Sequence, residues 1–246
     1  IHRYDVPNIS VHVDLLHVMA YDYHVASSPN THHNAPLYKD DTDHNDYLTV
    51  NYSIHYWLSK GAPADKLVLG LPMYGRCWGL DDLDKHGIGA PGTPGPSGPY
   101  SAERGILFYS EICKHQKNHQ GEWTIVNDEE MEVPYGYWNK VWCGYDHEES
   151  IANKAVYAHT LGLRGLMVWA VDQDDAHKEC STKNFPLTRM AKEAFTPTST
   201  TANPDWSSST ESSNGTTATA TSLTPRGHSY VAATAIALLL MLFTNY

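Results

Sequence analysis

The sequence predicts an α/β fold in which buried parallel strands alternate with helices. Three apolar runs have the length and character of strands, and they cover residues 15–21 (LLHVMAY), 67–73 (LVLGLPM) and 166–171 (LMVWAV). None of them alternates cleanly between apolar and polar residues, so we expect each strand to be buried on both faces, as in a parallel sheet. Helical patterns lie between the runs, which indicates repeated β/α units.

Three segments carry the signals of a helix. The first runs from about Val50 to Leu58, where apolar residues recur every three to four positions, and Gly61 marks its end. The second covers about residues 150–161 and stops before a glycine, and the third follows Pro186. The resulting order is strand, helix, strand, insertion, helix, strand, helix.

Polar or aromatic residues stand at the carboxyl ends of all three predicted strands, as on the active face of a (β/α)8 TIM barrel. Such a barrel needs eight β/α units, and residues 1–195 contain about three of them. A closed barrel is therefore not expected from this chain alone. The insertion, residues 77–143, starts Gly- and Pro-rich and continues with short strand-like runs, which predicts a small α+β subdomain.

The C-terminal region differs in composition from the rest of the chain. Residues 196–227 are rich in Ser, Thr and Asn, which predicts an extended, O-glycosylated linker. Residues 228–246 contain an apolar run (VAATAIALLLMLF) that is shorter than the about 20 residues of a spanning helix. This tail resembles a cleaved glycolipid-anchor signal, which would attach the protein to the cell surface. A short membrane anchor and a frame artefact are the alternatives.

Composition excludes some classes of function. The formal net charge is -11 and no dense run of Lys and Arg is present, so a nucleic-acid partner is not expected. The chain has seven Trp and sixteen Tyr against four Phe, a bias that suits either sugar-stacking surfaces or an ordinary amphipathic core. No ligand spacing indicates a metal site.

Cysteine usage favours secretion. The four cysteines are widely spaced and form no C-x-x-C motif, which favours two disulfides made in an oxidising compartment. Asn-x-Ser/Thr sequons, which are glycan acceptors in such a compartment, occur at Asn8, Asn51 and Asn214. The sequence begins at Ile1 and shows no leader, so we expect residues upstream of it.

A series of motifs follows the predicted strands. At residues 19–22 (MAYD) a strand delivers a phenol and a carboxylate to its carboxyl end. Further motifs are HNAPLY at 33–38, WLSKGAPADKLVLGLPMYGR at 57–76, YSEIC at 109–113 and MVWAVDQDD at 167–175. In this order they resemble the sixth to eighth strands of family-18 glycoside hydrolases, which are chitinases and chitinase-like proteins. The resemblance implies an α/β fold that is the C-terminal part of that family's catalytic barrel, with an α+β insertion subdomain.

The resemblance also implies a mechanism. In this family the sugar's own N-acetyl oxygen attacks the anomeric carbon, so catalysis is substrate-assisted. Tyr21 would hydrogen-bond that acetamido group, and Asp22 would hold the sugar and bias the position of the acid. Trp169 would form a flat floor under the reacting ring.

Further residues would surround this centre by the same resemblance. Tyr74, Arg76 and Glu111 would line neighbouring subsites, and Met19 and Met167 would pack the pocket. Two alternatives stay open, because Arg76 and Glu111 could instead form an ion pair between the insertion and the barrel, and the Met residues could belong to the core. No cofactor is implied.

The resemblance implies one disulfide directly, between Cys113 and Cys180. Cys77 and Cys143 then remain, at the two ends of the insertion, and would pair across its base.

The catalytic acid of the family is expected in a D-x-x-D-x-D-x-E motif on the fourth strand, which this sequence does not contain. Residues 172–179 (DQDDAHKE) come near to it, but His177 stands where the third Asp belongs and the segment follows the last predicted strand. We therefore do not expect this near-match to be catalytic.

Three hypotheses follow from these patterns. The first is an endo-acting, retaining chitinase that hydrolyses β-1,4-linked N-acetylglucosamine polymers, of which this is the C-terminal portion. The second is a chitinase-like lectin that binds chitin or chito-oligosaccharides without hydrolysis, and the residue at the acid position separates the two. The third is a truncated product with no stable fold. For the first two we expect an extracellular or cell-surface monomer.

Overall fold

The computed structural model describes residues 4–40 and 47–196. The predicted tail, all of the predicted linker after its first residue, and the sequon at Asn214 lie outside the described residues. Within the described part, no helix combines the length and the apolar character that crossing a membrane requires.

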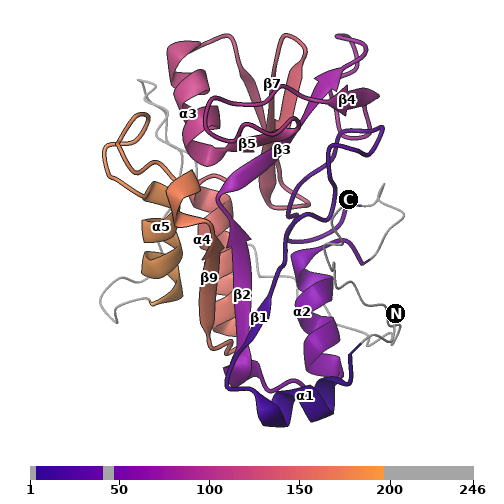
Figure 1. Cartoon of the computed structure of the whole chain (residues 1–246), viewed down its shortest axis with the longest axis vertical. Coiled ribbons are helices and arrows are strands. Elements are labelled where there is room, and N and C mark those ends of the chain that lie inside the picture. Colours follow the sequence, from indigo (N-terminus) through magenta and orange to yellow (C-terminus); the bar gives the residue numbers. More distant parts are fainter. Residues whose placement is uncertain (1–3, 41–46, 197–246) are drawn as a thin grey trace, which may run out of the picture. The chain divides into compact units, whose positions relative to one another are not determined.

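Three parallel strands form the sheet on which the rest is built (Figure 1). They are β1 (Leu16–Val18), β2 (Leu67–Pro72) and β9 (Gly165–Trp169), and their order in the sheet is β1-β2-β9. Each lies within or close to one of the predicted runs. β1 is shorter than its run, so residues 19–21 follow the strand instead of ending it.

Burial differs between the three strands. Every residue of β2 is buried, whereas His17 of β1 is exposed and Trp169 of β9 is 55% exposed. The expectation that all three strands are buried on both faces is therefore wrong for β1 and β9. Among the described residues these two are the edge strands of the sheet, and an edge strand has a neighbour on one side only.

Helices connect the parallel strands. The three predicted helices are present as α2 (Val50–Ser59), α4 (Glu148–Thr160) and α5 (Pro186–Phe195), and α4 and α5 pack against each other. The hydroxyl of Thr49 caps α2 by accepting the Tyr52 N–H at 3.1 Å. The sequence interpretation missed the short helix α1 (Val6–His12) and the 3-10 turns η1 (Ala64–Lys66) and η2 (Val171–Gln173).

The insertion folds as the expected α+β subdomain, beyond the carboxyl ends of the parallel strands (Figure 1). It is a six-stranded antiparallel sheet with the helix α3 (Tyr109–Asn118). The strands are β3 (Tyr74–Leu80), β4 (Gly92–Pro94), β5 (Ile106–Phe108), β6 (Thr124–Asp128), β7 (Val133–Trp138) and β8 (Val141–Gly144). A second hydrophobic core around Trp78 and Trp142, both 0% exposed, stabilises this sheet.

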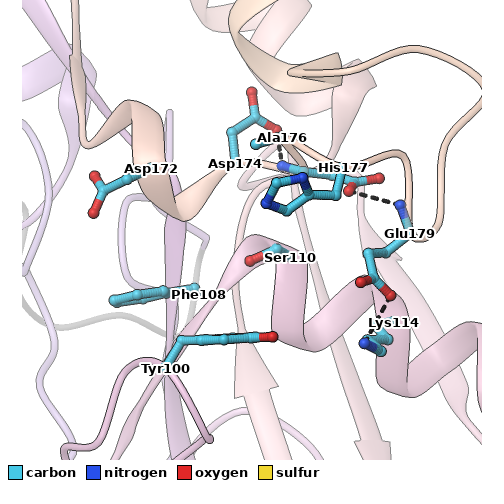
Figure 2. Close-up of a pocket in the computed structure, with 10 residues that line it drawn as sticks. Tyr100, Phe108, Ser110, Lys114, Asp172, Asp174, Ala176, His177 and Glu179 are labelled. Atoms are coloured by element: carbon cyan, nitrogen blue, oxygen red, sulfur yellow. Dashed lines mark hydrogen bonds and ion pairs between the residues drawn. The ribbon is translucent and has the colours of Figure 1, made fainter.

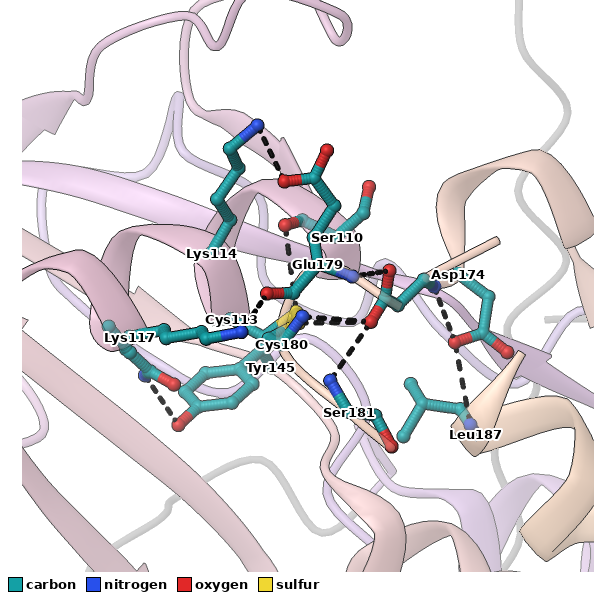
Figure 3. The surroundings of a disulfide bond; sticks show 12 residues. Ser110, Cys113, Lys114, Lys117, Tyr145, Asp174, Glu179, Cys180, Ser181 and Leu187 are labelled. Atoms are coloured by element: carbon teal, nitrogen blue, oxygen red, sulfur yellow. Dashed lines mark hydrogen bonds and ion pairs between the residues drawn. A yellow bond between two sulfur atoms is a disulfide. The ribbon is translucent and has the colours of Figure 1, made fainter. Parts of the chain in front are cut away.

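Both predicted disulfides are present. Cys77 on β3 and Cys143 on β8 lie directly opposite each other and are bonded, which ties the first and last strands of the insertion together. Cys113 on α3 is bonded to Cys180, in the segment that precedes α5 (Figure 3). The second disulfide therefore links the insertion to the parallel-sheet part of the fold.

Asp175 organises the segment that contains Cys180. Its carboxylate accepts the backbone N–H groups of Glu179 at 2.8 Å, Cys180 at 3.0 Å and Ser181 at 3.1 Å. Burial alone would raise the pKa of Asp175, but these hydrogen bonds outweigh it and lower the pKa. Asp175 also lies close to both sulfurs of the Cys113–Cys180 pair. Those sulfurs are bonded to each other, so neither is a thiolate that could hold a metal.

Candidate functional site

The candidate site lies at the carboxyl ends of the three parallel strands, where the polar residues of consecutive motifs converge. β1 ends at Val18 and is followed by residues 19–22. β2 ends at Pro72 and leads within two residues into β3, which carries Tyr74 and Arg76. β9 ends at Trp169. Parallel strands place these chain segments at one edge of the sheet.

Asp22 is the centre of this arrangement. The hydroxyl of Tyr74 donates to its Oδ1 at 2.6 Å, and Arg76 Nε donates to the same oxygen at 2.8 Å. Arg76 Nη2 forms an ion pair with this oxygen at 2.6 Å. The Asp22 side chain is 8% exposed and the Arg76 side chain 11% exposed, so the ion pair is largely shielded from water. Burial and the Asp22 charge raise the pKa of Tyr74 well above its usual value, which keeps its hydroxyl protonated.

Only one of the two Asp22 oxygens is used by these bonds. Among the described residues, no group donates to Oδ2. Oδ2 is also absent from the fully buried atoms that lack a partner, so it is accessible. Asp22 thus has one oxygen fixed by the protein and one left for a ligand. Its backbone φ of 60° is an uncommon conformation for a residue other than glycine.

Asn34 holds this conformation in place. Its Oδ1 accepts the Asp22 N–H at 3.0 Å, its Nδ2 donates to the Tyr74 carbonyl at 3.1 Å, and its own carbonyl accepts the Tyr23 N–H at 3.1 Å. Sequence reasoning missed this role, although Asn34 lies in the HNAPLY motif. The available signal was an Asn in the loop that follows the MAYD motif.

Tyr21 carries a buried hydroxyl that has no hydrogen-bond partner. Its ring meets the Tyr74 ring edge to face, with centroids 6.2 Å apart. Gly70 on β2 makes room for it, because a Cβ there would lie 2.6 Å from the Val18 carbonyl oxygen and 2.9 Å from the Tyr21 ring. Burial, and then the Asp22 charge, raise the pKa of Tyr21 to about 12. Tyr21 is therefore a protonated donor beside a carboxylate.

An unsatisfied buried hydroxyl is uncommon in a folded protein, because leaving such a group unpaired costs about 1–3 kcal/mol. The Tyr21 hydroxyl can donate a hydrogen bond to a ligand oxygen, and the free oxygen of Asp22 can accept one from a ligand N–H or O–H. One acceptor and one donor close together are what an amide group presents.

Trp169 and the two Met residues differ in exposure. Trp169 is 55% exposed at the end of β9, where its carbonyl accepts the Met73 N–H at 2.8 Å. Met19 is 46% exposed at the end of β1. Met167 packs against the small cluster that contains Tyr21, so the core alternative fits Met167 better than Met19.

Glu111 lies in the first turn of α3 and is buried. Its Oε1 accepts the backbone N–H groups of Tyr100 at 2.7 Å and Ser101 at 3.1 Å, and its Oε2 accepts the Phe108 N–H at 2.8 Å. Gly98 leaves space for this carboxylate, because a Cβ there would lie within 2.2 Å of Oε1. Glu111 thus shapes the loop beside the site through the backbone.

These contacts decide the alternative left open for Arg76 and Glu111. Arg76 pairs with Asp22, and Glu111 is occupied by three backbone N–H groups. The ion pair between Arg76 and Glu111 that the sequence allowed is therefore wrong. A direct contact of Glu111 with sugar stays a prediction.

Residues 172–179, which come near to the D-x-x-D-x-D-x-E motif, include two carboxylates with structural roles. Asp174 is buried and caps α5, accepting the Thr188 N–H and hydroxyl at 2.9 Å each and the Leu187 N–H at 3.4 Å. Such a contact at a helix N-terminus stabilises the helix. The two central carboxylates of the segment, Asp174 and Asp175, are therefore bound to backbone.

A cavity of about 260 Å³ opens where the insertion meets the segment after β9 (Figure 2). Figure 2 shows Tyr100 and Phe108 along one side, His177 and the acidic segment along the other, and Ser110 between them. The residues that line it are Tyr100, Phe108, Ser110, Lys114, Asp172, Asp174, Asp175, Ala176, His177 and Glu179. Of these, sequence reasoning had noted the acidic segment and the YSEIC motif, which contains Ser110.

Comparison with known proteins gives a consistent family. Residues 1–174 match the sequence profile described as "Glycosyl hydrolases family 18". The chain is 40% identical over 186 residues to "Probable chitinase 10" of Drosophila melanogaster, covering 75% of this chain and 8% of that protein. It is 37% identical over 207 residues to "Chitotriosidase-1" of Mus musculus, covering 82% of this chain and 43% of that protein.

Solved structures agree with the sequence relatives. The Group IV chitinase of Ostrinia furnacalis matches with a TM-score of 0.75 and 36% identity, over 78% of this chain and 53% of that chain. Human YKL-39, described as a pseudo-chitinase with retained chitooligosaccharide binding properties, matches with a TM-score of 0.73 and 32% identity, also over 78% of this chain and 53% of that chain.

The chain spans about half or less of the length of these relatives. With its fold, its motifs and the profile match taken together, the chain belongs to glycoside hydrolase family 18 and carries part of that family's catalytic domain.

Proposed function

We propose that the whole protein is a chitinase-type hydrolase of β-1,4-linked N-acetylglucosamine polymers, and that this chain supplies the half of the site that binds the acetamido group. The observation that carries the proposal is the buried, unpartnered Tyr21 hydroxyl beside Asp22, whose second oxygen is free. An N-acetyl group offers an acceptor oxygen and an N–H donor, which complement these two protein groups.

In a substrate-assisted reaction the acetamido oxygen attacks the anomeric carbon, and the protein orients that group and stabilises the positive ring that forms. Tyr21 would donate to the acetamido oxygen and fix its direction of attack. Asp22, anchored by Arg76 and Tyr74, would accept from the acetamido N–H as positive charge develops. The exposed face of Trp169 would stack under the sugar ring.

The acid that protonates the leaving oxygen is not part of this sequence. In this proposal it comes from the D-x-x-D-x-D-x-E strand of the whole protein. Asp174 and Asp175 do not substitute for it, because their oxygens accept backbone N–H groups.

A second candidate is a lectin that binds chito-oligosaccharides without hydrolysing them. It is favoured by the likeness to human YKL-39, whose description is that of a pseudo-chitinase with retained chitooligosaccharide binding properties. The binding residues discussed above serve either function, so the residue at the acid position separates the two.

Intact mass and N-terminal sequencing of the native protein test this difference. A chain that extends upstream and contains a strand ending in D-x-x-D-x-D-x-E supports the hydrolase, and an aliphatic or amide residue in place of the Glu supports the lectin. A native protein that begins at Ile1 refutes hydrolysis by it, and cooperative unfolding of that protein would in turn contradict the idea of a product with no stable fold.

Binding is tested independently of hydrolysis. Tyr21→Phe removes the unpartnered hydroxyl and should weaken binding of an N-acetylglucosamine tetramer, measured by calorimetry. Tyr23→Phe is the matched control, because its hydroxyl already donates to Ser53 Oγ at 2.6 Å. Equal affinity in the wild type and Tyr21→Phe would refute the proposed role of Tyr21.

We further propose that the protein is secreted, is held at the cell surface by its tail, and acts as a monomer. The even set of cysteines, all four paired, supports an oxidising compartment. Asn8 is exposed but its Nδ2 donates to Asp5 Oδ2 at 2.6 Å, and the Asn51 side chain accepts a hydrogen bond from the Tyr157 hydroxyl at 3.1 Å. Glycopeptide mapping would identify which sequon is used.

A further inference from the structure

The cavity between the insertion and the segment after β9 contains one carboxylate that the protein leaves unpaired (Figure 2). Of the four carboxylates that line it, Asp174 and Asp175 accept backbone N–H groups, and Glu179 pairs with Lys114 at 2.7 Å. Asp172 is exposed and has no hydrogen-bond or ion-pair partner within residues 4–40 and 47–196.

Aromatic rings form the side of the cavity across from this acidic segment. The Tyr100 ring is 68% exposed and Phe108 is half-buried, and Figure 2 shows both on that side, with the Ser110 hydroxyl between the two walls. The faces of such rings carry negative potential and attract cations. A carboxylate and aromatic faces around one space favour a ligand that has an apolar body and a positive charge.

The charge balance disfavours anionic ligands. Lys114 is the one Lys or Arg that lines the cavity, and Glu179 already neutralises it. A phosphate or a carboxylate ligand would therefore meet Asp172 without a compensating Lys or Arg. The net charge of -11 over the whole chain also favours the approach of a positively charged polymer.

Asp172, which lines the cavity, is close in sequence to Trp169, the residue proposed to stack on the sugar. Asp172 follows Trp169 by three residues, which places their Cα atoms at most about 11 Å apart. Asp172 lies in the 3-10 turn η2, which begins two residues after Trp169. A polysaccharide that stacks on Trp169 can therefore reach the cavity with a neighbouring unit.

We propose that this cavity is a subsite for a deacetylated, positively charged glucosamine unit, and that Asp172 selects its ammonium group. The inference rests on the proposed function, because it assumes that a chitin-like chain binds at Trp169. It adds a substrate class, which is partially deacetylated chitin. An N-acetylated unit would offer Asp172 a neutral amide and so would gain less from both the carboxylate and the rings.

Calorimetry with the full chain tests the proposal at mildly acidic pH, where the amino sugar is protonated. The two probes are a glucosamine tetramer and an N-acetylglucosamine tetramer. Asp172→Asn should weaken binding of the glucosamine tetramer about tenfold, or roughly 1.4 kcal/mol, and change that of the acetylated tetramer less than about twofold. Tyr100→Leu should weaken the glucosamine tetramer about two- to fivefold.

Asp65→Asn is the matched control, because Asp65 is an exposed carboxylate in η1, which precedes β2 and so lies at the opposite end of the strands. It should leave both affinities unchanged. Added salt should weaken binding of the glucosamine tetramer only.

The outcomes separate the inference from the function on which it rests. If the acetylated tetramer binds and Asp172→Asn has no selective effect on the glucosamine tetramer, the subsite is refuted and the proposed function stands. If the folded chain binds neither tetramer, both are refuted. Selective loss in Asp172→Asn, with Asp65→Asn like the wild type, confirms the subsite.

Discussion

Replacing Arg76 by methionine leaves the buried carboxylate of Asp22 without the cation that contacts it. In the wild type, Arg76 Nε donates to Asp22 at 2.8 Å and Arg76 Nη2 forms an ion pair with it at 2.6 Å, and both side chains are nearly enclosed. At an effective dielectric of about 20 and a charge separation of about 4 Å, the attraction is about 4 kcal/mol. Leaving one partner of such a pair buried and alone typically costs about 3–5 kcal/mol.

We therefore expect Arg76→Met to lower the free energy of unfolding by about 3–5 kcal/mol. Urea unfolding followed by tryptophan fluorescence measures this value. Lys85→Met is the matched control, because Lys85 and Asp82 are 3.3 Å apart but their side chains are 65% and 42% exposed. An exposed pair contributes about 0–1 kcal/mol, so the control should stay near the wild type.

The double variant Asp22→Asn/Arg76→Met removes both charges. It should be more stable than Arg76→Met alone, because no charge is left buried without a partner. This comparison also holds if the single variant is too unstable to purify. The reasoning is refuted if Arg76→Met costs no more than Lys85→Met, or if the double variant gains nothing over the single one.

Three further predictions concern residues outside this ion pair. Gly70→Ala should cost about 1–3 kcal/mol of stability, because the new methyl group overlaps Val18 and Tyr21. Lys154→Met should cost about 3–5 kcal/mol, because Lys154 is 0% exposed and donates to the buried Asp146 at 2.5 Å. Burial, and then the charges of two neighbouring His side chains, lower the pKa of His24 to about 3. The unfolded chain therefore takes up this proton first, and stability should fall between about pH 6.5 and pH 3 by up to about 1.4 kcal/mol per pH unit.

Each of these has a matched comparison in urea unfolding. Gly165→Ala introduces a methyl group with nothing within 4 Å and should be neutral, so equal losses at Gly70 and Gly165 would contradict the steric argument. Asp146→Asn/Lys154→Met should recover much of the loss seen in Lys154→Met. His24→Gln should flatten the acid dependence, whereas the exposed His177→Gln should not; the same slope in both variants would show that His24 is not responsible.

The sequence was sufficient for features that depend on local pattern. The strand at Leu67–Pro72, the helix that begins at Val50 and the helix that begins at Pro186 follow from apolar runs, helical spacing and an N-terminal proline. Ordered motifs also predicted the family, the barrel-type architecture and the Cys113–Cys180 disulfide, because each motif is a short run whose spacing the chain preserves. The Cys77–Cys143 disulfide was predicted because these two cysteines remained.

Partner choice between distant residues depended on the tertiary structure. From sequence, Arg76 could pair with Glu111 or line a subsite, and only the meeting of β3 with the loop after β1 makes Asp22 its partner. Only the tertiary structure likewise shows that Asn34 binds the Asp22 N–H, and that the Tyr21 hydroxyl has no hydrogen-bond partner. Burial of β1 and β9 was mispredicted for a related reason, since an apolar run does not reveal whether its neighbours on both sides are present.

What the sequence determined by itself was therefore the family, the order of the elements and the residue types delivered to the carboxyl ends of the strands. The tertiary structure decided which of those residues share charges and hydrogen bonds, which remain available to a ligand, and that an aromatic-walled cavity lies beside Asp172. The physical reason is that local pattern reflects backbone preference and burial, whereas a site is made by contacts between segments far apart in the chain.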